Sequence, residues 1–375
     1  MHNTRVKILY FIPGFYYGGI ETFAVTMMEQ FDRSCFQIDL LKHENNPDKT
    51  PLLHRVRSLG GEVYNLPPFR ITHIFSYIKA TYIFLKSHSD YQAIHCHSLV
   101  HSFFLLLFAS MFSIPVRILH SHTSHSDEGW LHRLMGNFFR YLSLPLSTAF
   151  VACSDKAAIW GFGKSNYLKD KVKIVHNGIQ LSDFKFKSED RNRIRSEYQI
   201  TDKIVIGHVG RLTTAKNGRF LLDVIKAAVS KDPRVVLMQI GDGPDLDALK
   251  QYVQELGIAN HVLFMGRKNN VSAYYSAFDV FFLPSLWEGA PLCAIEAQAN
   301  GLPCVLSDVI TREVEVCEGV LFISLEAPLS TWVEALLDIY MNRNISTKAI
   351  QTLTEVGYDY KSSVKTLEQL YTQVK

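Results

Sequence analysis

Residues 284–303 read PSLWEGAPLCAIEAQANGLP, and this order predicts the end of a strand, a glycine-containing loop and the start of a helix. A strand is expected to end at Pro284. Pro291 then falls near the first helical turn, where the N–H group that proline lacks would have no partner anyway. Strand–loop–helix units of this kind build parallel α/β sheets.

Two carboxylates bracket the predicted helix start. Glu288 lies in the loop, and Glu296 lies about a turn and a half into the helix, with its side chain tilted back towards the helix N-terminus. Free N–H groups around residues 290–293 would attract an anion. The segment therefore fits a ligand with a diphosphate in its middle and hydroxyls at both ends. Capping and dipole compensation are the alternative explanation for two glutamates in this position.

The alternation of strand and helix continues on both sides of this segment. Short, continuous apolar strands separated by helices predict parallel sheets covered on both faces, and ligands of such sheets bind outside the carboxyl ends of the strands. The expected strands are 7–11, 37–41, 62–66, 93–97, 116–120, 149–153 and 172–176, then 204–209, 235–240, 262–265, 280–283 and 303–306. We therefore expect an α/β fold of two tandem, doubly wound, Rossmann-like domains that face a central cleft, with a boundary near residue 180.

Length and composition agree with two soluble globular domains. The chain has 375 residues, of which 47% are hydrophobic and 20% charged. Its six cysteines are scattered without a C-x-x-C pair, which favours reduced thiols of a cytosolic protein over a disulfide framework or a zinc site. The apolar run 103–112 (FFLLLFASMF) is shorter than the roughly 20 residues that cross a bilayer. It is either a buried helix or a patch that touches a membrane.

Charge is distributed unevenly along the chain. Residues 1–180 carry 18 Lys and Arg against 12 Asp and Glu, and they hold 13 of the 15 histidines. A basic first half suits an anionic surface or a phosphate-bearing acceptor. A solvated face without a partner is the alternative.

Several further motifs occur in a characteristic order. They are GGIE at 18–21, VHNGI at 175–179, GRLTTAKN at 210–217, GDGP at 241–244 and GR at 266–267, followed by the two glutamates Glu288 and Glu296 in an E-x7-E spacing. Together they resemble the large retaining glycosyltransferase family 4, which has the GT-B fold. The stretch from Glu296 to Cys304, with Ser307-Asp308 and 311–313 (TRE), further resembles the branch that builds bacterial capsular and exopolysaccharides.

The resemblance implies a role for each matching residue. Arg211 and Lys216 would clamp the diphosphate of a nucleotide sugar, and fixed cations do stabilise the charge that develops on such a leaving group. Glu288 would bind hydroxyls of the transferred sugar and Glu296 those of the ribose. Further donor-binding residues would be Gly18, Gly19, Gly210, Gly241, Gly243, Arg267, Ser285, Gly289, Ala290, Pro291 and Leu292.

Histidines cluster at the ends of two predicted strands of the first domain, at positions 95, 97, 120, 122 and 125. Close histidines can bind a metal, but carboxylates are sparse around them and the resembled family needs no metal for transfer. We therefore expect neither a metal nor another cofactor. The resemblance instead implies one histidine over the reacting sugar, which is His122 or, alternatively, His120.

The expected function is that of a metal-independent, retaining glycosyltransferase. It would move a sugar, UDP-linked by resemblance to that branch, to a glycan or polyprenyl-diphosphate-linked acceptor in bacterial surface polysaccharide synthesis. The donor would bind residues 181–357 and the acceptor residues 1–180, with a final helix at about 358–375 packing back on the first domain. We expect a cytoplasmic protein with peripheral contact to an anionic membrane and no nucleic-acid partner. A nucleotide-sugar epimerase on the same fold and an inactive binding or scaffold subunit are the alternatives.

Overall fold

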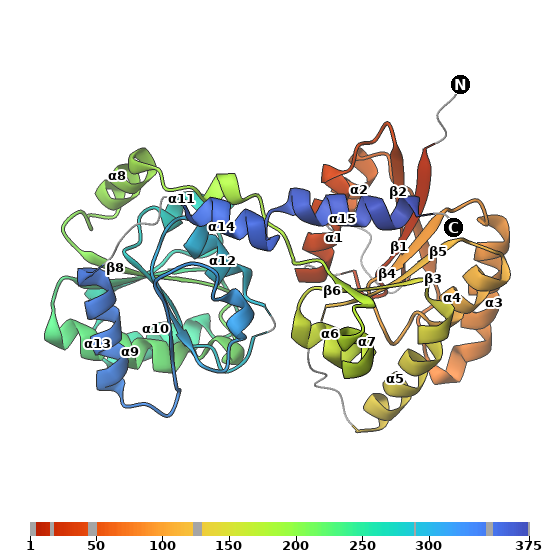
Figure 1. The fold of residues 1–375 in the computed structure, drawn as a ribbon. Helices are drawn as coiled ribbons and strands as arrows, with labels where there is room; N and C mark the ends of the chain where they lie inside the picture. Colours follow the sequence, from red (N-terminus) through yellow and green to blue (C-terminus); the bar gives the residue numbers. More distant parts are fainter. Residues whose placement is uncertain are drawn as a thin grey trace. The chain divides into compact units, whose positions relative to one another are not determined.

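The computed structural model divides the chain into two compact units, each built on one parallel sheet (Figure 1). Unit 1 comprises Met1–Gly178 and Tyr360–Lys375, and unit 2 comprises Ile179–Asp359. The structure describes residues 5–15, 19–43, 51–122, 130–288, 290–342 and 348–373. The division between the units falls beside residue 180, and the last helix belongs to unit 1.

The sheet of unit 1 has seven parallel strands in the order β3-β2-β1-β4-β5-β6-β7. Strand order reverses between β1 and β4, which are hydrogen-bonded neighbours with Tyr10 opposite His95. Such a reversal places a crevice at the carboxyl ends of the two strands. The strands are β1 (Val6–Phe11), β2 (Phe36–His43), β3 (Val63–Leu66), β4 (Ala93–Cys96), β5 (Val116–Ser121), β6 (Ala149–Ala152) and β7 (Val172–Ile174).

Helices cover both faces of this sheet. Apolar residues of α1, α2 and α15 pack on one face, and those of α3, α4 and α6 pack on the other. The run 103–112 forms α4, whose Leu105, Leu106 and Ala109 are buried, whereas its Leu107 and Met111 are exposed. The helices are α1 (Gly19–Gln30), α2 (Pro51–Ser58), α3 (Ile74–Ser87), α4 (Phe103–Met111), α5 (Trp130–Ser143), α6 (Asp155–Phe162), α7 (Lys164–Leu168) and α15 (Tyr360–Thr372), with 3-10 turns η1 (Ile71–His73) and η2 (Leu144–Leu146).

The sheet of unit 2 has six parallel strands in the order β10-β9-β8-β11-β12-β13. Its edge strand β13 was not among the strands expected from the sequence, and the expectation that a helix follows each strand is wrong after β12. Only the short turn η6 (Arg312–Val314) connects β12 to β13. The strands are β8 (Ile204–Val209), β9 (Val235–Ile240), β10 (Val262–Phe264), β11 (Val280–Leu283), β12 (Cys304–Ser307) and β13 (Val320–Ile323).

Two helical layers also cover the second sheet. Apolar residues of α8, α11, α12 and α14 pack on one face, and those of α9, α10 and α13 pack on the other. The helices are α8 (Ser188–Glu197), α9 (Gly218–Lys231), α10 (Leu246–Glu255), α11 (Val271–Tyr275), α12 (Leu292–Ala299), α13 (Leu329–Met341) and α14 (Ala349–Val356), with 3-10 turns η3 (Leu181–Phe184), η4 (Thr214–Lys216) and η5 (Ala259–His261).

Two sequence expectations concern cysteines and membrane spans. All six cysteines are free thiols, and Cys96, Cys153 and Cys304 are buried. Within the described parts of the chain, every helix is too short or too polar to cross a bilayer.

Candidate functional site

Two loops meet at the carboxyl edge of the sheet in unit 2. Strands β8 and β11 run side by side in parallel, with Val280 opposite Ile206, so the segments that follow them leave the same edge. One loop spans residues 210–217 and the other follows Pro284. The backbone N–H of Leu286 donates a hydrogen bond to the carbonyl of Ala215 at 2.8 Å. This bond holds the lysine-bearing loop against the glutamate-bearing loop.

Lys216 and Glu288 form an ion pair at this junction. The ammonium of Lys216 contacts Oε1 of Glu288, and the two side chains are only 15% and 13% exposed. The hydroxyl of Ser285 donates to the same Oε1 at 2.7 Å. The carbonyl of Ser285 in turn accepts a hydrogen bond from the Ser307 hydroxyl at 2.6 Å. Two residues proposed from the sequence, Lys216 and Ser285, therefore both contact a third, Glu288.

The environment of Lys216 keeps its side chain charged. Burial acts to lower the pKa of Lys216, but charge interactions with Cys293 and Glu288, together with the hydrogen bond to Glu288, leave that pKa raised. A cation held away from bulk water interacts more strongly with an anion than an exposed one does. The arrangement can therefore stabilise a phosphate oxygen next to a hydroxyl-binding carboxylate.

Glycines allow the backbone segments at this edge to approach closely. A Cβ on Gly241, whose φ is +129°, would lie 2.0 Å from the carbonyl oxygen of Gly210. A Cβ on Gly243 would lie 2.1 Å from the carbonyl oxygen of Leu212, and a Cβ on Gly210 would lie 2.9 Å from Cε of Lys216. The three predicted glycines thus let the loop after β9 rest on the loop that carries Lys216.

Glu296 lies in α12 and is held by a residue that the sequence did not suggest. The hydroxyl of Tyr275, at the end of α11, donates to Oε2 of Glu296 at 2.6 Å. Burial raises the pKa of Glu296, and the hydrogen bond from Tyr275 opposes this rise only in part. A carboxylate in this position can accept hydrogen bonds from a diol, which is the chemistry of a ribose.

The start of α12 defines which backbone N–H groups are free to bind an anion. Pro291 lies immediately before the first turn, near where the sequence placed it, and its ψ of 104° is extended. Its carbonyl accepts the N–H of Ala294 at 3.0 Å. Ala290 lies just outside the helix, and the N–H groups of Leu292 and Cys293 belong to the first turn, which has no acceptors within the helix. The expected anion-binding N–H groups are therefore those of Leu292 and Cys293.

Two arginines lie on loops at the same edge of the sheet. Arg211 follows Gly210 directly and Arg267 follows Gly266, and both side chains are exposed. The N–H of Gly241 donates to the carbonyl of Gly266 at 3.0 Å, which ties the loop after β10 to the loop after β9. Arg211 and Arg267 thus lie on neighbouring loops and are accessible to an anionic ligand.

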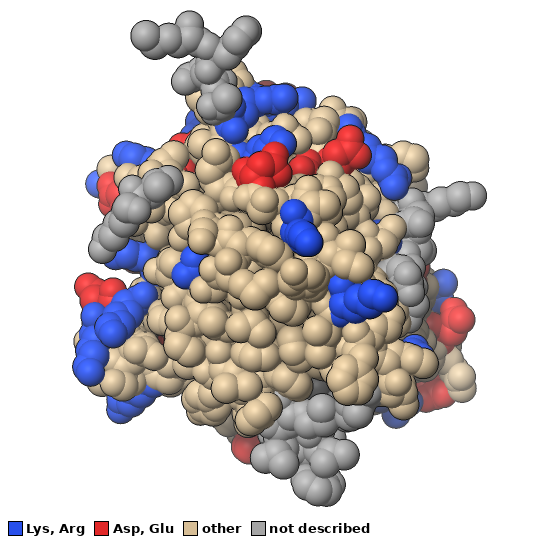
Figure 2. Space-filling model, turned by 90° about the vertical axis from the view of Figure 1, so that its right-hand side faces the viewer, with Lys and Arg blue, Asp and Glu red and all other residues tan. Residues whose placement is uncertain are grey.

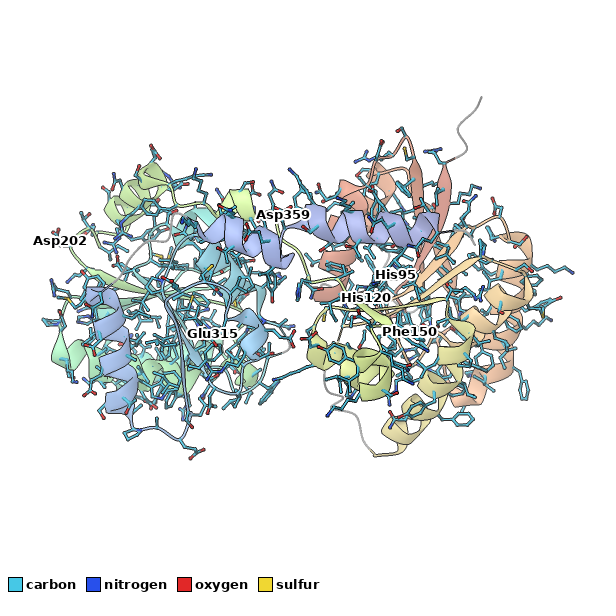
Figure 3. The ribbon with its side chains drawn as sticks, in the orientation of Figure 1. His95, His120, Phe150, Asp202, Glu315 and Asp359 are labelled. Atoms are coloured by element: carbon cyan, nitrogen blue, oxygen red, sulfur yellow. The ribbon has the colours of Figure 1, made fainter. Side chains whose placement is uncertain are left out.

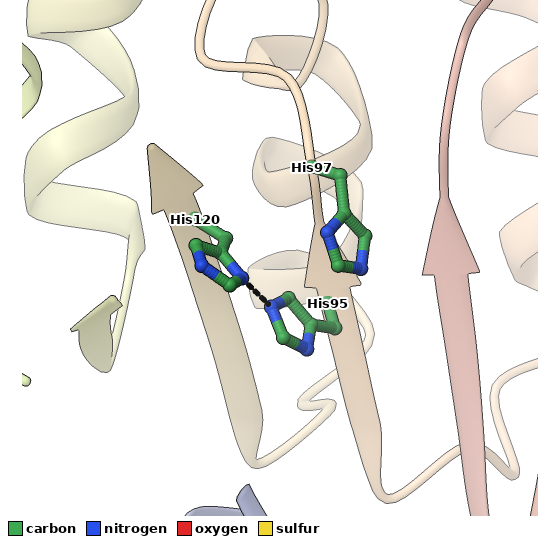
Figure 4. A group of neighbouring side chains, drawn as sticks. All are labelled: His95, His97 and His120. Atoms are coloured by element: carbon green, nitrogen blue, oxygen red, sulfur yellow. Dashed lines mark hydrogen bonds between the residues drawn. The ribbon is translucent and has the colours of Figure 1, made fainter. Parts of the chain in front are cut away.

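The histidines predicted from the sequence form a cluster in unit 1. They lie on one face of the sheet at the carboxyl ends of β4 and β5, and Figure 3 shows His95 beside His120. Nε2 of His95 and Nδ1 of His120 are 3.0 Å apart, as Figure 4 shows. Nδ1 of His97 and Nε2 of His122 are 2.9 Å apart. The two strands therefore contribute two hydrogen-bonded imidazole pairs.

Burial makes these four imidazoles neutral. It lowers the pKa of His122 to about 3, and it lowers the pKa values of His95, His97 and His120 well below the ordinary value. Ring nitrogens of His95, His97 and His120 lie within 4.8 Å of one another, a spacing that could hold a metal. Hydrogen bonds already account for the clustering of the rings, since His95 uses Nε2 for His120 and Nδ1 for Tyr371. We therefore assign no ion to them.

The structure distinguishes the two candidate histidines by exposure. His120 is fully buried, whereas His122 is partly exposed at the end of β5. Gly19 begins α1, while Gly18, Gly289 and His125 lie outside the described residues. The histidines and Gly19 belong to unit 1, and every other described candidate belongs to unit 2.

Sequence reasoning missed Tyr275 and Tyr371, which contact Glu296 and His95 respectively. The tyrosine residue type alone carried no signal for either contact. Each contact forms only because the fold packs the helix that carries the tyrosine against Glu296 or His95.

Two family models match successive parts of the chain. Residues 17–183 match the family described as Glycosyltransferase Family 4, and residues 190–351 match Glycosyl transferases group 1. The two matched regions correspond closely to unit 1 and unit 2. The second match lies within unit 2 and includes Lys216, Glu288 and Glu296.

Curated relatives extend over most of the chain. EpsF of Bacillus subtilis (strain 168), which carries the name of a glycosyltransferase, is 31% identical over 376 residues, covering 99% of this chain and 97% of the relative. The UDP-Gal:alpha-D-GlcNAc-diphosphoundecaprenol alpha-1,3-galactosyltransferase of Escherichia coli is 25% identical over 319 residues, covering 81% of this chain and 79% of the relative.

Solved structures share the fold. Anabaena Alr3699/HepE in complex with UDP has a TM-score of 0.79 at 15% identity, covering 97% of this chain and 98% of its own. WaaG, a glycosyltransferase involved in lipopolysaccharide biosynthesis, has a TM-score of 0.69 at 15% identity, covering 98% of this chain and 100% of its own. With the sequence relationship to EpsF, these matches show that the chain belongs to glycosyltransferase family 4 and has the GT-B fold.

Proposed function

We propose that this protein is a retaining glycosyltransferase that moves a sugar from a UDP-sugar to a glycan or polyprenyl-diphosphate-linked acceptor in bacterial surface polysaccharide synthesis. The observation that carries the proposal is the contact of Lys216, Ser285 and Glu288 at the carboxyl edge of the sheet in unit 2. Glu296 and the start of α12 lie on the segment that follows.

The donor site would use each group for one part of the nucleotide sugar. Lys216, Arg211 and the first N–H groups of α12 would bind the diphosphate, because their charges and dipoles favour an anion. Glu288 would accept hydrogen bonds from the transferred sugar, and Glu296 from the ribose. The choice of UDP is supported by the UDP-Gal donor in the name of the E. coli relative and by the UDP complex of Alr3699/HepE.

The proposed chemistry is departure of the diphosphate with attack by the acceptor on the same face of the sugar. A cation fixed in a water-poor site stabilises the leaving phosphate without reorganisation during the reaction. Glu288 is engaged by both Lys216 and Ser285, which suits binding of hydroxyls better than covalent attack on the sugar. We propose that transfer needs no metal, since Lys216 and Arg211 supply positive charge.

The acceptor would bind unit 1, where His122 is partly exposed. A neutral imidazole can both donate and accept a hydrogen bond, so it suits a sugar hydroxyl. A polyprenyl-linked acceptor would also bring the protein to a membrane. The outer face of α3, α4 and α5 is suited to that contact.

This face, which we call the α3–α5 face, combines exposed apolar side chains with basic charge. Seven of the fifteen exposed large hydrophobic residues described in the chain lie on these three helices: Phe75, Ile83, Leu107, Met111, Phe138, Tyr141 and Leu142. The three helices contain no Asp or Glu. Figure 2 shows the corresponding side of the protein as a broad tan area broken by a few blue side chains, with red side chains towards its margins.

Helix α3 shows the pattern most clearly. Phe75, Lys79, Ile83 and Lys86 follow one another at intervals of three or four residues and are all exposed, so they share one side of the helix. Exposed apolar and basic side chains in this arrangement are typical of helices that bind the interface of an anionic bilayer. We propose that the α3–α5 face docks on anionic lipid.

Product analysis with a labelled donor tests the proposed function. The purified protein is incubated with labelled UDP-sugars, with and without a polyprenyl-diphosphate-linked sugar acceptor. Transfer predicts label in the lipid product only when acceptor is present. An epimerase would convert the donor sugar without acceptor, and a scaffold subunit would leave the donor unchanged, so either result would contradict the proposal.

Two further arms of the same experiment test the mechanism. The anomeric configuration of the new bond, read by NMR coupling constants, should match that of the donor. Addition of EDTA should leave the rate unchanged. An inverted product or loss of activity with EDTA would refute retention or metal independence respectively, without refuting transfer.

A further inference from the structure

A chain of hydrogen bonds runs through the core of unit 1 from its first strand to its histidine cluster. The hydroxyls of Tyr10 in β1 and Tyr371 in α15 are 2.8 Å apart. The Tyr371 hydroxyl lies 2.5 Å from Nδ1 of His95, and Nε2 of His95 lies 3.0 Å from Nδ1 of His120. All four side chains are fully buried. The last helix of the chain thereby contacts the cluster at the carboxyl ends of β4 and β5.

The protonation of each member can be assigned from its burial. Burial raises the pKa values of Tyr10 and Tyr371, so each keeps its hydroxyl proton. Burial lowers the pKa values of His95 and His120, so each ring is neutral and carries a single N–H. Each of the four groups therefore has one proton to donate, and three hydrogen bonds connect them.

His95 has one ring proton, so the bonds on either side of its ring run in one of two directions. In one, Tyr10 donates to Tyr371, Tyr371 donates to His95, and His95 donates from Nε2 to His120. In the other, every donor becomes an acceptor. The first direction leaves the proton of His120 on Nε2, and the second leaves it on Nδ1. The nitrogen of His120 that carries the ring proton therefore depends on whether Tyr371 donates a hydrogen bond to His95 or accepts one from it.

Chemistry favours the first direction. It pairs a phenol, the stronger donor, with an imidazole nitrogen, the stronger acceptor, whereas the reverse asks an imidazole N–H to bond a weakly accepting phenol oxygen. A buried donor without a partner costs about 1–3 kcal/mol. Each direction leaves one buried proton without a partner among the described residues, that of His120 in the first and that of Tyr10 in the reverse, so this cost does not separate them.

We propose that Tyr371 sets the tautomer of His95 and, through it, that of His120, so that His120 holds its ring proton on Nε2. Nε2 of His120 is buried and has no partner among the described residues. A buried, unpartnered donor beside the exposed end of β5 is suited to an oxygen of a bound sugar. This use of the donor rests on the proposed function, whereas the tautomer does not. Tyr371 is then a positioning residue supplied by the last helix.

Nitrogen NMR of the histidine rings tests the tautomer directly. The protein is labelled with 15N-histidine, and the resonances are assigned with His95→Gln and His120→Asn variants. We expect single Nε2–H tautomers for His95 and His120 in the wild type. Tyr371→Phe should convert them to a mixture of the two tautomers. Tyr10→Phe should leave them unchanged, because Tyr371 can still donate to His95.

The control is Tyr77→Phe, which removes a hydroxyl from an equally buried tyrosine of unit 1 that bonds the carbonyl of His101 instead. It should leave both tautomers unchanged. An Nδ1–H tautomer of His120 in the wild type would overturn the inference, and so would an unaltered spectrum of Tyr371→Phe. If Tyr371→Phe does not fold, the tautomers of His95 and His120 in the wild type and in Tyr10→Phe still test the inference.

Transfer assays separate this inference from the proposed function. Tyr371→Phe should lower kcat by about 10-fold with little change in KM for the donor, since a misplaced proton weakens catalysis more than binding. Altered tautomers with undiminished transfer would support the hydrogen-bond chain and remove His120 from the proposed reaction. A wild-type protein that transfers no sugar would refute the proposed function and leave the NMR result valid.

Discussion

The Lys216 ammonium and the Glu288 carboxylate form an ion pair across 72 residues of chain. Neither side chain depends on the other for its place in the fold. Lys216 follows β8, Glu288 follows β11, and the pairing of these strands brings the two loops together. The pair therefore lies where a parallel sheet ordinarily binds its ligand.

Replacement of either partner should abolish most transfer. Lys216→Met and Glu288→Gln should each lower kcat/KM by about 100-fold or more, the usual effect of losing one charge-stabilising group. Steady-state kinetics with a UDP-sugar measures this. The exposed Lys231→Met in α9 is the matched control and should leave kcat/KM unaltered. Full activity in both site variants would refute the site.

Stability should respond to the same two changes in a non-additive manner. Lys216→Met leaves the shielded carboxylate of Glu288 without its cation and should destabilise unit 2 by about 2 kcal/mol. Lys216→Met with Glu288→Gln removes both charges and should regain most of that loss. Urea denaturation of the wild type, the two single variants and the double variant measures the coupling free energy between the two side chains. Additive effects would show that the pair does not interact.

Tyr275 should control the pH at which the donor binds. Burial already raises the pKa of Glu296, and the hydrogen bond from Tyr275 opposes this rise. Tyr275→Phe should raise that pKa further, so the carboxyl group becomes protonated, and a poorer acceptor for ribose, at a higher pH. UDP affinity should therefore fall at a higher pH in the variant, as calorimetry between pH 5 and 8 can measure. Identical pH profiles would disprove the link.

Gly241 should tolerate no side chain. Gly241→Ala would place Cβ 2.0 Å from a backbone oxygen at a φ of +129°, so the expected destabilisation is at least about 3 kcal/mol. Gly257→Ala is the control, because its φ of +68° is also positive but nothing lies within 4 Å of the new Cβ. It should cost about 1 kcal/mol. Equal losses in chemical denaturation would contradict the predicted collision.

The strands of the fold were largely predictable because each is a short apolar run bounded by turn residues. β8, β9 and β11 have the predicted limits. β13 was missed because it follows β12 through a 3-10 turn, so no helical pattern marked its approach. Local sequence indicates a strand best where a helical pattern separates it from the strand before it.

The candidate site was predictable only where motifs mark it. Lys216, Ser285 and Glu288 stand in recognisable segments, and the structure brings them into contact. His120 and His122 are two residues apart and share one face of β5, so sequence could not tell which is exposed. That depends on where the sheet edge falls. Tyr371 reaches His95 across 276 residues, a contact that no local pattern contains.

Membrane binding should depend on the exposed side of α3. Lys79→Glu with Lys86→Glu should weaken binding to vesicles rich in phosphatidylglycerol by at least about 10-fold, since each lysine near an anionic surface contributes about 1 kcal/mol. Phe75→Ser with Ile83→Ser should weaken binding through lost apolar insertion. Vesicle co-sedimentation measures both.

Met341→Ser is the control for these variants, because Met341 is 73% exposed but lies on α13 of unit 2. It should bind vesicles as the wild type does. Binding that falls equally in all variants, or in none, would contradict docking through the α3–α5 face. Binding to neutral phosphatidylcholine vesicles with the same affinity would contradict the role of the lysines.

Unit 1 should be the more acid-sensitive half of the protein. Burial lowers the pKa values of five of its described histidines, including His43 to about 4 and His122 to about 3, from an ordinary 6.5. In unit 2 the pKa of His208 is similarly lowered, to about 4. A folded-state pKa below the unfolded value means that the unfolded chain binds more protons. The stability that these histidines contribute is therefore present above pH 6.5 and is lost as the pH falls below it.

Each such histidine lowers the free energy of unfolding by up to about 1.4 kcal/mol per pH unit in that window. Five groups against one imply that unit 1 opens before unit 2 as the pH falls below 6.5. Amide hydrogen exchange at pH 7.5 and 5.5, corrected for the intrinsic rate, measures the opening of each unit separately. The strands β1, β4 and β5 should lose protection at pH 5.5 while β8, β9 and β11 keep theirs. Equal protection losses in the two sheets would mean that the buried histidines accept protons without unfolding unit 1.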